Sequence, residues 1–237
     1  MGLGGSSEDD VRYQWRSGAM IEKSAEMDGR AGKKGKRQTQ AERSSNTQAK
    51  ICNATLEALA EVGYHCITTA FIAKKAKVSR GALTHQYASR NDLLVAALQR
   101  LHNDWSQIRP FTANPTTEEY TVAQLITELW ENLFSDKRYI ASLELMVAAR
   151  LDNDLGIRLR DEMSRWVNVR DEFLRSLNFT DRKMGLNVQH LHLMMSTMRG
   201  VALYQLFDRD VQAGQKLIEL YSSLVESRVD PADTKEE

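Results

Sequence analysis

Apolar residues recur every three or four positions through most of the chain after residue 46. This spacing gathers the apolar side chains on one face of an α-helix, whereas a half-buried strand would alternate apolar and polar residues. Few segments alternate in that way, and three prolines in 237 residues leave long stretches in which helices can continue. The pattern predicts an all-α protein.

Four helices are predicted between residues 47 and 105, because each apolar stripe there follows a residue that can cap a helix N-terminus. The first stripe ends at Gly63, which suits the left-handed residue after a helix. Asp92 follows Ser89 at capping-box spacing, so its carboxylate is expected to bond back to the Ser89 amide. The candidate N-caps are Ser45 to Thr47, Thr68 or Thr69, Ser79 and Ser89.

The third of these helices lies within the segment VSRGALTHQY, residues 78–87, which has few apolar side chains. Val78, Leu83 and Tyr87 are expected to anchor it. A short turn separates it from the second helix, as in a helix-turn-helix unit, whose second helix enters the major groove of DNA. The anchors would leave the other side chains facing outward: Arg80, Ala82, Thr84, His85 and Gln86.

Charge is divided unevenly along the chain, although the whole chain is neutral with 32 basic and 32 acidic residues. Residues 29–103 contain 13 Lys and Arg but 4 Asp and Glu, whereas residues 104–237 contain 16 and 22. A basic end suits a polyanion such as nucleic acid, and an acidic end repels it. The charge pattern therefore favours DNA binding by the same part of the chain as the helix pattern.

A longer motif covers the predicted turn and both of its helices. It reads T-x2-I-A-x2-A-x-V-S-x-G-x-L-x3-Y-x-S-R-x2-L from Thr69 to Leu93 and closely resembles the DNA-binding region of the TetR family of bacterial transcriptional repressors. The resemblance implies an N-terminal three-helix helix-turn-helix DNA-binding domain joined to a helical regulatory domain that dimerises and binds a small molecule. We accordingly expect a flexible basic tail at 1–46, the DNA-binding domain at 47–92, the regulatory domain at 93–230 and a C-terminal tail at 231–237.

The chain departs from the usual family pattern at a few positions. Lys77 stands where a glycine usually supplies a left-handed residue, and lysine there should cost about 1 kcal/mol. Thr84 occupies a position that is often an aromatic residue in contact with phosphate. Tyr87 and Arg90 replace the frequent Phe and Lys, and keep the roles of a core ring and of a cation beside the DNA backbone.

Arg80 is the best candidate for reading guanine, since a guanidinium can donate to both O6 and N7. Thr84 and His85 are candidates for further base or phosphate contacts, whereas Thr69 and Arg90 are expected to hold phosphates. The complete set of candidate DNA-binding residues is Thr69, Ser79, Arg80, Gly81, Ala82, Thr84, His85, Tyr87 and Arg90.

The last two predicted helices, at about residues 181–207 and 211–228, have wide apolar faces. The resemblance implies that this pair meets its copy in a four-helix dimer interface, where Gly200 would permit close approach of the helices. Burial of the same faces inside one chain is the alternative. The candidate interface residues are Leu191, Met195, Gly200, Leu203, Ile218, Tyr221, Leu224 and Val225.

Methionine and tryptophan in the regulatory half can line an adaptable cavity, although they also build ordinary cores. Arg199 could orient an acidic group of a ligand or form a surface salt bridge. We expect an unidentified small-molecule effector, with no cofactor and no metal. The candidate pocket residues are Trp130, Met146, Trp166, Met194, Met198 and Arg199.

Enzymatic activity is not expected, because no nucleophile, base or metal set assembles by spacing; His190 and His192, for example, would lie about 200° apart on a helix. Two cysteines do not make a disulfide framework, and no apolar run approaches the ~20 residues of a membrane span, so we expect the cytoplasm. The sequence thus favours a homodimeric repressor that binds a near-palindromic operator and is released by a small molecule. A redox-responsive regulator using Cys52 and Cys66, or an activator of the same fold, are the alternatives.

Overall fold

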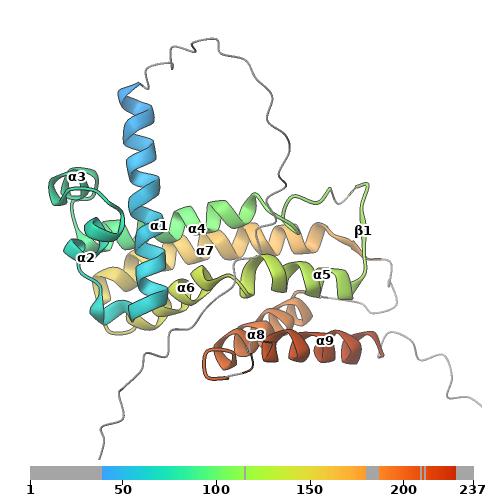
Figure 1. The fold of residues 1–237 in the computed structure, drawn as a ribbon. Coiled ribbons are helices and arrows are strands. Elements are labelled where there is room, and N and C mark those ends of the chain that lie inside the picture. The colour runs from blue at the N-terminus through green and yellow to red at the C-terminus, as the bar shows by residue number, and fades with distance from the viewer. Residues whose placement is uncertain (1–38, 115, 180–186, 209, 211, 228–237) are drawn as a thin grey trace, which may run out of the picture. The chain divides into compact units, whose positions relative to one another are not determined.

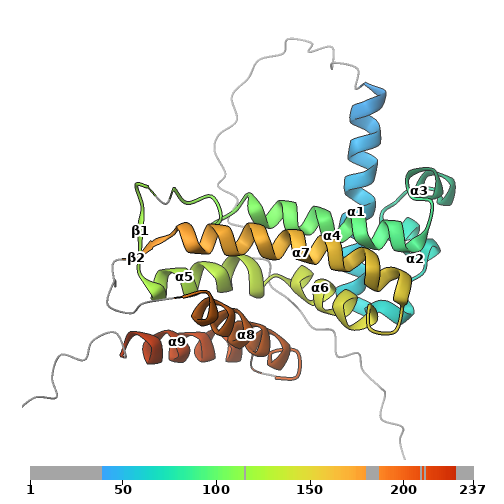
Figure 2. The same ribbon diagram turned by 180° about the vertical axis from the view of Figure 1, so that it is seen from behind.

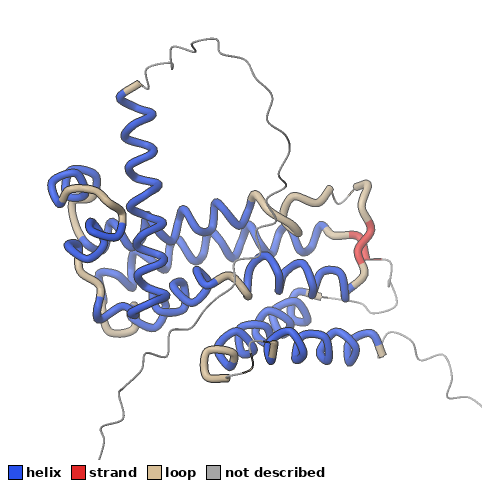
Figure 3. Tube along the Cα trace, viewed as in Figure 1, coloured by secondary structure: helices blue, strands red, loops and turns tan. Residues whose placement is uncertain are grey.

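The computed structural model describes residues 39–114, 116–179, 187–208, 210 and 212–227. Helices make up most of these residues (Figure 3), which confirms the all-α prediction. Residues 1–38, 181–186 and 231–237, on which parts of the predicted tails and of one predicted helix fall, lie outside the described ranges. In chain order the elements are α1 (Gln40–Cys66), α2 (Thr69–Lys75), α3 (Arg80–Gln86), α4 (Arg90–Ser106), β1 (Glu119–Tyr120), α5 (Val122–Leu129), the π-helical turn η1 (Trp130–Phe134), α6 (Lys137–Ala148), α7 (Asn153–Ser176), β2 (Asn178–Phe179), α8 (Val188–Tyr204) and α9 (Ala213–Glu226).

Helix α4 lies at the centre of the packing. It contacts α1 and runs beside α7, and both views of the ribbon show the latter pair side by side (Figures 1 and 2). Five of its side chains are completely buried. At the other end of the molecule α9 packs against α5 and α8, and the short strands β1 and β2 pair in parallel. The fully buried residues of α4 are Leu93, Leu94, Ala97, Leu98 and Leu101.

Helix α1 begins earlier than the sequence analysis expected. Its N-cap is Thr39, whose hydroxyl accepts from the Glu42 amide at 3.2 Å while the Glu42 carboxylate accepts from the Thr39 amide at 2.8 Å. The expected start at residues 45–47 is therefore wrong, and residues 40–46 of the predicted tail are helical. Residues 40–46 are exposed apart from the partly buried Ser44, which explains why they show no apolar stripe, and the start of α1 extends beyond the other helices in Figure 1.

A break in α1 occurs at Gly63, where the sequence predicted a helix end. Its φ of 73° and ψ of 169° are not helical, and a short helical segment to Cys66 follows. A Cβ at this position would lie 3.1 Å from Oε2 of Glu144 on α6. Glycine thus provides both the backbone conformation and the close approach of α1 to α6.

The N-caps of α2, α3 and α4 are confirmed, but the capping box predicted at α4 is not formed. The hydroxyls of Thr68, Ser79 and Ser89 each accept from the amide three residues further on, at 3.1, 3.0 and 3.0 Å. The Asp92 carboxylate, however, accepts from the Ser89 hydroxyl at 2.8 Å and not from the Ser89 amide. Its other oxygen accepts from Arg158 on α7, so the predicted capping box is replaced by a contact between helices.

Lys77 has a left-handed backbone conformation, with φ of 55°, as predicted from the glycine that usually stands at this position in the family. The Val78 amide donates to the Ala73 carbonyl at 3.0 Å and the Lys77 amide to the Lys74 carbonyl at 3.2 Å. These two bonds form a Schellman motif, which ends α2 and requires a left-handed residue at this position. Lysine therefore holds a conformation that strains its Cβ.

We expect Lys77→Gly to raise the free energy of unfolding by about 1 kcal/mol, because glycine adopts positive φ without a Cβ clash. Urea unfolding of both proteins would measure the difference. Lys74→Gly is the matched control, since Lys74 lies within α2 and glycine there should lower the free energy of unfolding by about 1 kcal/mol. A loss of stability in both variants would contradict the strain assigned to Lys77.

Candidate functional site

Helices α2 and α3 form a helix-turn-helix whose underside is apolar. Ile72 of α2 is fully buried and Leu83 of α3 is 2% exposed. Val78 and Tyr87, at the two ends of α3, are partly buried against the same core. The three predicted anchors of α3 are therefore confirmed, and they fix which face of α3 points outward.

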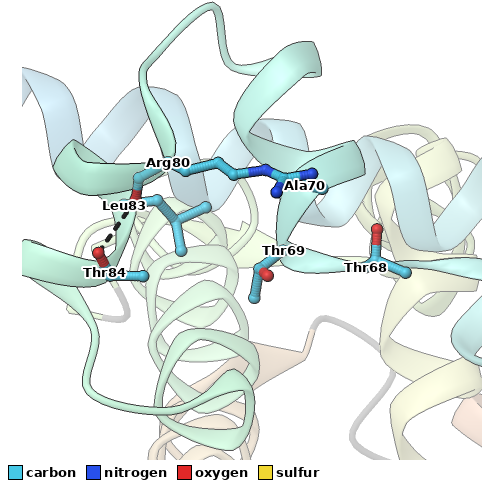
Figure 4. Close-up of a pocket in the computed structure, with 6 residues that line it drawn as sticks. All are labelled: Thr68, Thr69, Ala70, Arg80, Leu83 and Thr84. Carbon is cyan, nitrogen blue, oxygen red and sulfur yellow. Dashed lines mark hydrogen bonds between the residues drawn. The ribbon is translucent and has the colours of Figure 1, made fainter.

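The outward face carries Arg80, Gly81, Thr84 and His85, all of which are exposed, with Ala82 partly buried beside them. A hollow lies between this face and the start of α2, and in Figure 4 the Arg80 side chain reaches from α3 towards Ala70. The Arg80 guanidinium has no hydrogen bond or ion pair within the described ranges, and the Thr84 hydroxyl donates back to the Arg80 and Gly81 carbonyls at 3.1 and 3.2 Å. The hollow is lined by Thr68, Thr69, Ala70, Arg80, Leu83 and Thr84.

These groups suit a nucleic acid. A guanidinium can read a base edge, and threonine hydroxyls can bond to phosphate oxygens. Thr69, which the sequence assigned to a phosphate, and Arg80, which it assigned to guanine, line the same hollow. The structure therefore brings these two predicted contacts together on one surface.

Gln86 does not face outward as predicted. Its side-chain oxygen accepts from Gln48 Nε2 at 2.9 Å, and its amide nitrogen donates to the Ser44 hydroxyl at 3.1 Å. Both partners lie in the first turns of α1, in or next to the segment that had been assigned to a tail. Gln86 thus braces the end of α3 against α1, and the Thr39-x-x-Glu42 capping box was the sequence signal that could have revealed this longer helix.

The comparisons with known proteins agree with this geometry. The family described as "Bacterial regulatory proteins, tetR family" matches residues 51–97. The HTH-type transcriptional regulator CymR of Pseudomonas putida is 32% identical over 185 residues, which cover 77% of this chain and 90% of CymR. The chain belongs to the TetR family. BetI of Escherichia coli is 41% identical over 64 residues, which cover 27% of this chain and 31% of BetI.

Solved structures of TetR-family regulators share the fold. A regulator from Rhodococcus sp. has a TM-score of 0.58 at 18% identity and covers 76% of this chain and 98% of its own. A regulator from Saccharomonospora viridis, in complex with choline, has a TM-score of 0.58 at 16% identity, with coverage of 77% and 96%. The protein is therefore a DNA-binding transcriptional regulator, and its relatives are regulators, not enzymes.

Tyr87 was among the candidate DNA contacts, but the structure gives it another place. Its hydroxyl lies 3.1 Å from Sγ of Cys52 on α1, and its ring packs against the core. Burial, followed by the contact with Cys52, raises the pKa of Tyr87. Tyr87 thus serves as the core ring that the TetR resemblance implied, and its contact with DNA stays a prediction.

The contact between Tyr87 and Cys52 also bears on the alternative of a redox-responsive regulator that uses Cys52 and Cys66. Cys52 is 4% exposed, and burial raises the pKa of its thiol, which disfavours the reactive thiolate. Cys66 is exposed at the end of α1, beyond the break at Gly63, and the unbroken helix from Cys52 to Val62 already spans about 15 Å by the usual rise per residue. A disulfide needs Cα atoms within about 7 Å, so these two cysteines cannot pair within one chain.

Arg90 was predicted to hold a phosphate, but in the structure its side chain contacts the fold, so the phosphate contact stays a prediction. Its Nη2 donates to the Tyr64 carbonyl at 2.7 Å, and its guanidinium lies 4.1 Å from the centre of the Tyr64 ring. The Nε atom is buried without a hydrogen-bond partner in the described part of the chain. Arg90 therefore faces the fold and joins the start of α4 to the end of α1.

Tyr64 is the centre of a polar joint that the sequence analysis missed. Its amide donates to Glu144 of α6 at 2.8 Å and its hydroxyl donates to Asp152, the N-cap of α7, at 3.0 Å. Nearby, Asn91 of α4 donates to Asp154 of α7 at 2.8 Å. The joint fastens the DNA-binding helices to α6 and α7, and its partners are too far apart in the sequence for spacing to reveal them.

The predicted pocket residues lie in the regulatory half and come from several of its helices. Trp130 lies against Gly214 of α9, whereas Trp166 of α7 stacks on His102 of α4 with ring centres 4.9 Å apart. Met194 and Met198 are buried, and Met146 and Arg199 are partly buried. Their role as ligand contacts stays a prediction.

Three of the eight predicted dimer residues face the inside of the chain. Leu191, Met195 and Ile218 are buried, and Tyr221 and Val225 are partly buried against the same core. Gly200, Leu203 and Leu224 are exposed as expected. The apolar faces of α8 and α9 are wide enough to supply both a core and an outer surface. The apolar pattern in the sequence therefore did not show which residues are buried and which are exposed. The exposed large apolar residues of this pair and of the turn after α8 are Leu193, Leu203, Tyr204, Phe207, Leu217, Leu220 and Leu224.

We expect Arg90→Ala to lower the free energy of unfolding by about 2 kcal/mol, because it removes a charged hydrogen bond and a cation–π contact. The slope of DNA affinity against salt concentration should not change, since no phosphate contact is lost. Arg100→Ala, on the same helix, is the control for a change in charge alone. A slope reduced by about one in Arg90→Ala would restore the phosphate assignment.

Proposed function

We propose that the protein is a ligand-responsive repressor that binds a near-palindromic operator as a homodimer and leaves it when a small molecule binds. The observation that supports this most strongly is the exposed face of α3, which presents Arg80 beside a hollow lined by Thr69 and Thr84. Two such helices, one from each copy, would enter successive major grooves about one helical turn apart. The basic residues at 29–103 supply attraction to the phosphates at any sequence.

Arg80 is the residue that we assign to base reading. We expect Arg80→Ala to weaken operator binding by roughly 1–3 kcal/mol and to relax sequence choice at one base pair per half-site. Selection from a random DNA library at two salt concentrations would measure both effects. Gln86→Ala is the matched control on the same helix, because Gln86 bonds to Ser44 and Gln48, and it should return the wild-type sequence.

An unchanged operator sequence in Arg80→Ala, or a changed one in Gln86→Ala, would reverse these assignments. If the wild-type protein enriches no sequence at all, the proposed operator binding fails.

The second copy would dock on α8 and α9. Leu193 and Gly200 are seven residues apart and lie on one stripe of α8, with Leu193 64% exposed, and Phe207, in the turn that follows α8, is 84% exposed. A Cβ added at Gly200 would meet no atom within 4 Å. Exposed apolar side chains around an open glycine suit the close approach of a second helix, and isologous contact with the same stripe is the simplest way to cover it.

Gly200→Trp tests this interface without disturbing the core of one chain, because the position is open in the monomer. We expect this variant to be monomeric at concentrations where the wild-type protein is a dimer, and to bind the operator at least tenfold more weakly. Sedimentation velocity and an operator titration would measure the two effects. Asp161→Trp, at an exposed position of α7, should stay dimeric, and a dimeric Gly200→Trp would place the interface elsewhere.

Release by a small molecule is supported by what related proteins hold. The Saccharomonospora viridis regulator was solved with choline, and the multidrug binding protein EbrR, with a TM-score of 0.51, was solved with imidazole. In this chain α4 would respond to such a ligand, because it carries His102 and Trp105 in the regulatory core and Arg90 at the joint. An effector that strengthens operator binding instead would make the protein an activator or a corepressor-dependent regulator.

A further inference from the structure

Arg199 of α8 is a partly buried cation that lacks a counter-ion in the described part of the chain. Its one hydrogen bond there runs from Nε to the hydroxyl of Tyr139 on α6, at 3.0 Å. The two Nη groups, which form the fork that binds a carboxylate side-on, are not used by any described residue. A guanidinium partly removed from water without an anion is costly, so such a group is retained more readily where an anion binds.

A second arginine adds to the positive charge. Arg170 of α7 is 7% exposed, and its partner Asp171 also accepts from His192 Nε2 at 2.9 Å. Burial raises the pKa of Tyr139, while the charges of Arg199 and Arg170 oppose that rise. The carboxylate of Asp171 is shared by two arginines, Arg170 at 2.6 Å and Arg175 at 3.9 Å.

The other carboxylates beside this region are already paired. Glu162 accepts from His102 Nδ1 at 2.7 Å and from Arg165. Asp104 and Asp136 both bond to Arg138, at 3.0 and 2.8 Å. These pairings leave Arg199 as the cation of the region that is open to an external anion.

An apolar wall adjoins this cation. The Tyr139 ring is 4.7 Å from the Phe134 ring and 6.0 Å from the Trp105 ring, and Trp105 lies 5.8 Å from Trp166. Trp105 is 1% exposed, and its Nε1 finds no acceptor among the described residues. An indole N–H can only donate a hydrogen bond, so this buried group, like the Arg199 Nη groups, lacks an acceptor oxygen.

We infer that the effector is a small organic acid with an apolar body, whose carboxylate binds Arg199 beside the Tyr139 hydroxyl and whose body lies against Trp105, Phe134 and Trp166. The inference rests on the proposed ligand response and names the chemical class of its ligand. A cation such as the choline held by the Saccharomonospora viridis regulator would be repelled here by Arg199 and Arg170.

The test uses benzoate, phenylacetate and octanoate, each beside its uncharged primary amide, with the purified full chain. The acids should raise the melting temperature of the protein and should release the selected operator duplex, whereas the amides should do neither at the same concentration. Arg199→Gln should bind the effective acid at least tenfold more weakly while still binding the operator. Arg160→Gln, at an exposed position of α7, should respond to the acid as the wild-type protein does.

Amides that act as well as the acids, an unchanged response in Arg199→Gln, or no response to any of the three acids would overturn the inference. If Arg199→Gln does not fold, Arg199→Lys replaces it: a single ammonium keeps the charge but loses the fork, so the affinity for the acid should still fall. The melting-temperature measurement needs no DNA. If the protein binds the acid but selects no operator, the proposed function is contradicted and the proposed acid site is not.

Discussion

The packing of α4 is the constraint on which the rest of the structure depends. Its inner side is completely buried, its first residues cap and position the end of the helix-turn-helix, and its last turns place His102 and Trp105 in the regulatory core. A helix of 17 residues spans about 25 Å, so the two ends serve sites that cannot touch each other. Because its buried face cannot slide without opening cavities, we expect the proposed ligand response to pass along this helix.

The two ends of α4 are held in different ways. At the regulatory end the contacts are aromatic and tolerate small shifts, whereas at the DNA-binding end they are directional hydrogen bonds through Tyr64 and Arg90. Helix α6 joins both regions, since it carries Tyr139 beside the aromatic cluster and Glu144 beside Tyr64. A partly buried polar joint of this kind has few equivalent arrangements, and this makes it suited to switching between two states in place of gradual bending.

The sequence predicted those features that depend on neighbouring residues. The caps at Thr68, Ser79 and Ser89 and the left-handed Lys77 are local, and each was found where the motif placed it. Arg90 and Gln86 were assigned to DNA because their partners, Tyr64 and Ser44, are distant in sequence and leave no periodic signal. The wide apolar faces of α8 and α9 did not reveal which stripe is buried, because packing against α5 and α7 decides it. The pocket residues follow no spacing rule, so composition could suggest them but could not show which of them adjoin Arg199.

The energetics of release set a limit that the proposed acid site can meet. An effector that weakens operator binding 100-fold must bind the released state about 100-fold more tightly than the DNA-bound state, a difference of about 2.7 kcal/mol. A hydrogen bond to a charged group contributes about 1.5–3 kcal/mol. The paired bonds from the Arg199 guanidinium to the carboxylate would therefore supply this difference if they form in the released state and not in the DNA-bound state. Arg199 and Tyr139 lie on different helices, and a carboxylate bound between them would fix the spacing of α8 and α6. Since α6 contacts α1 and bonds to Tyr64, that spacing bears on the joint from which α4 begins.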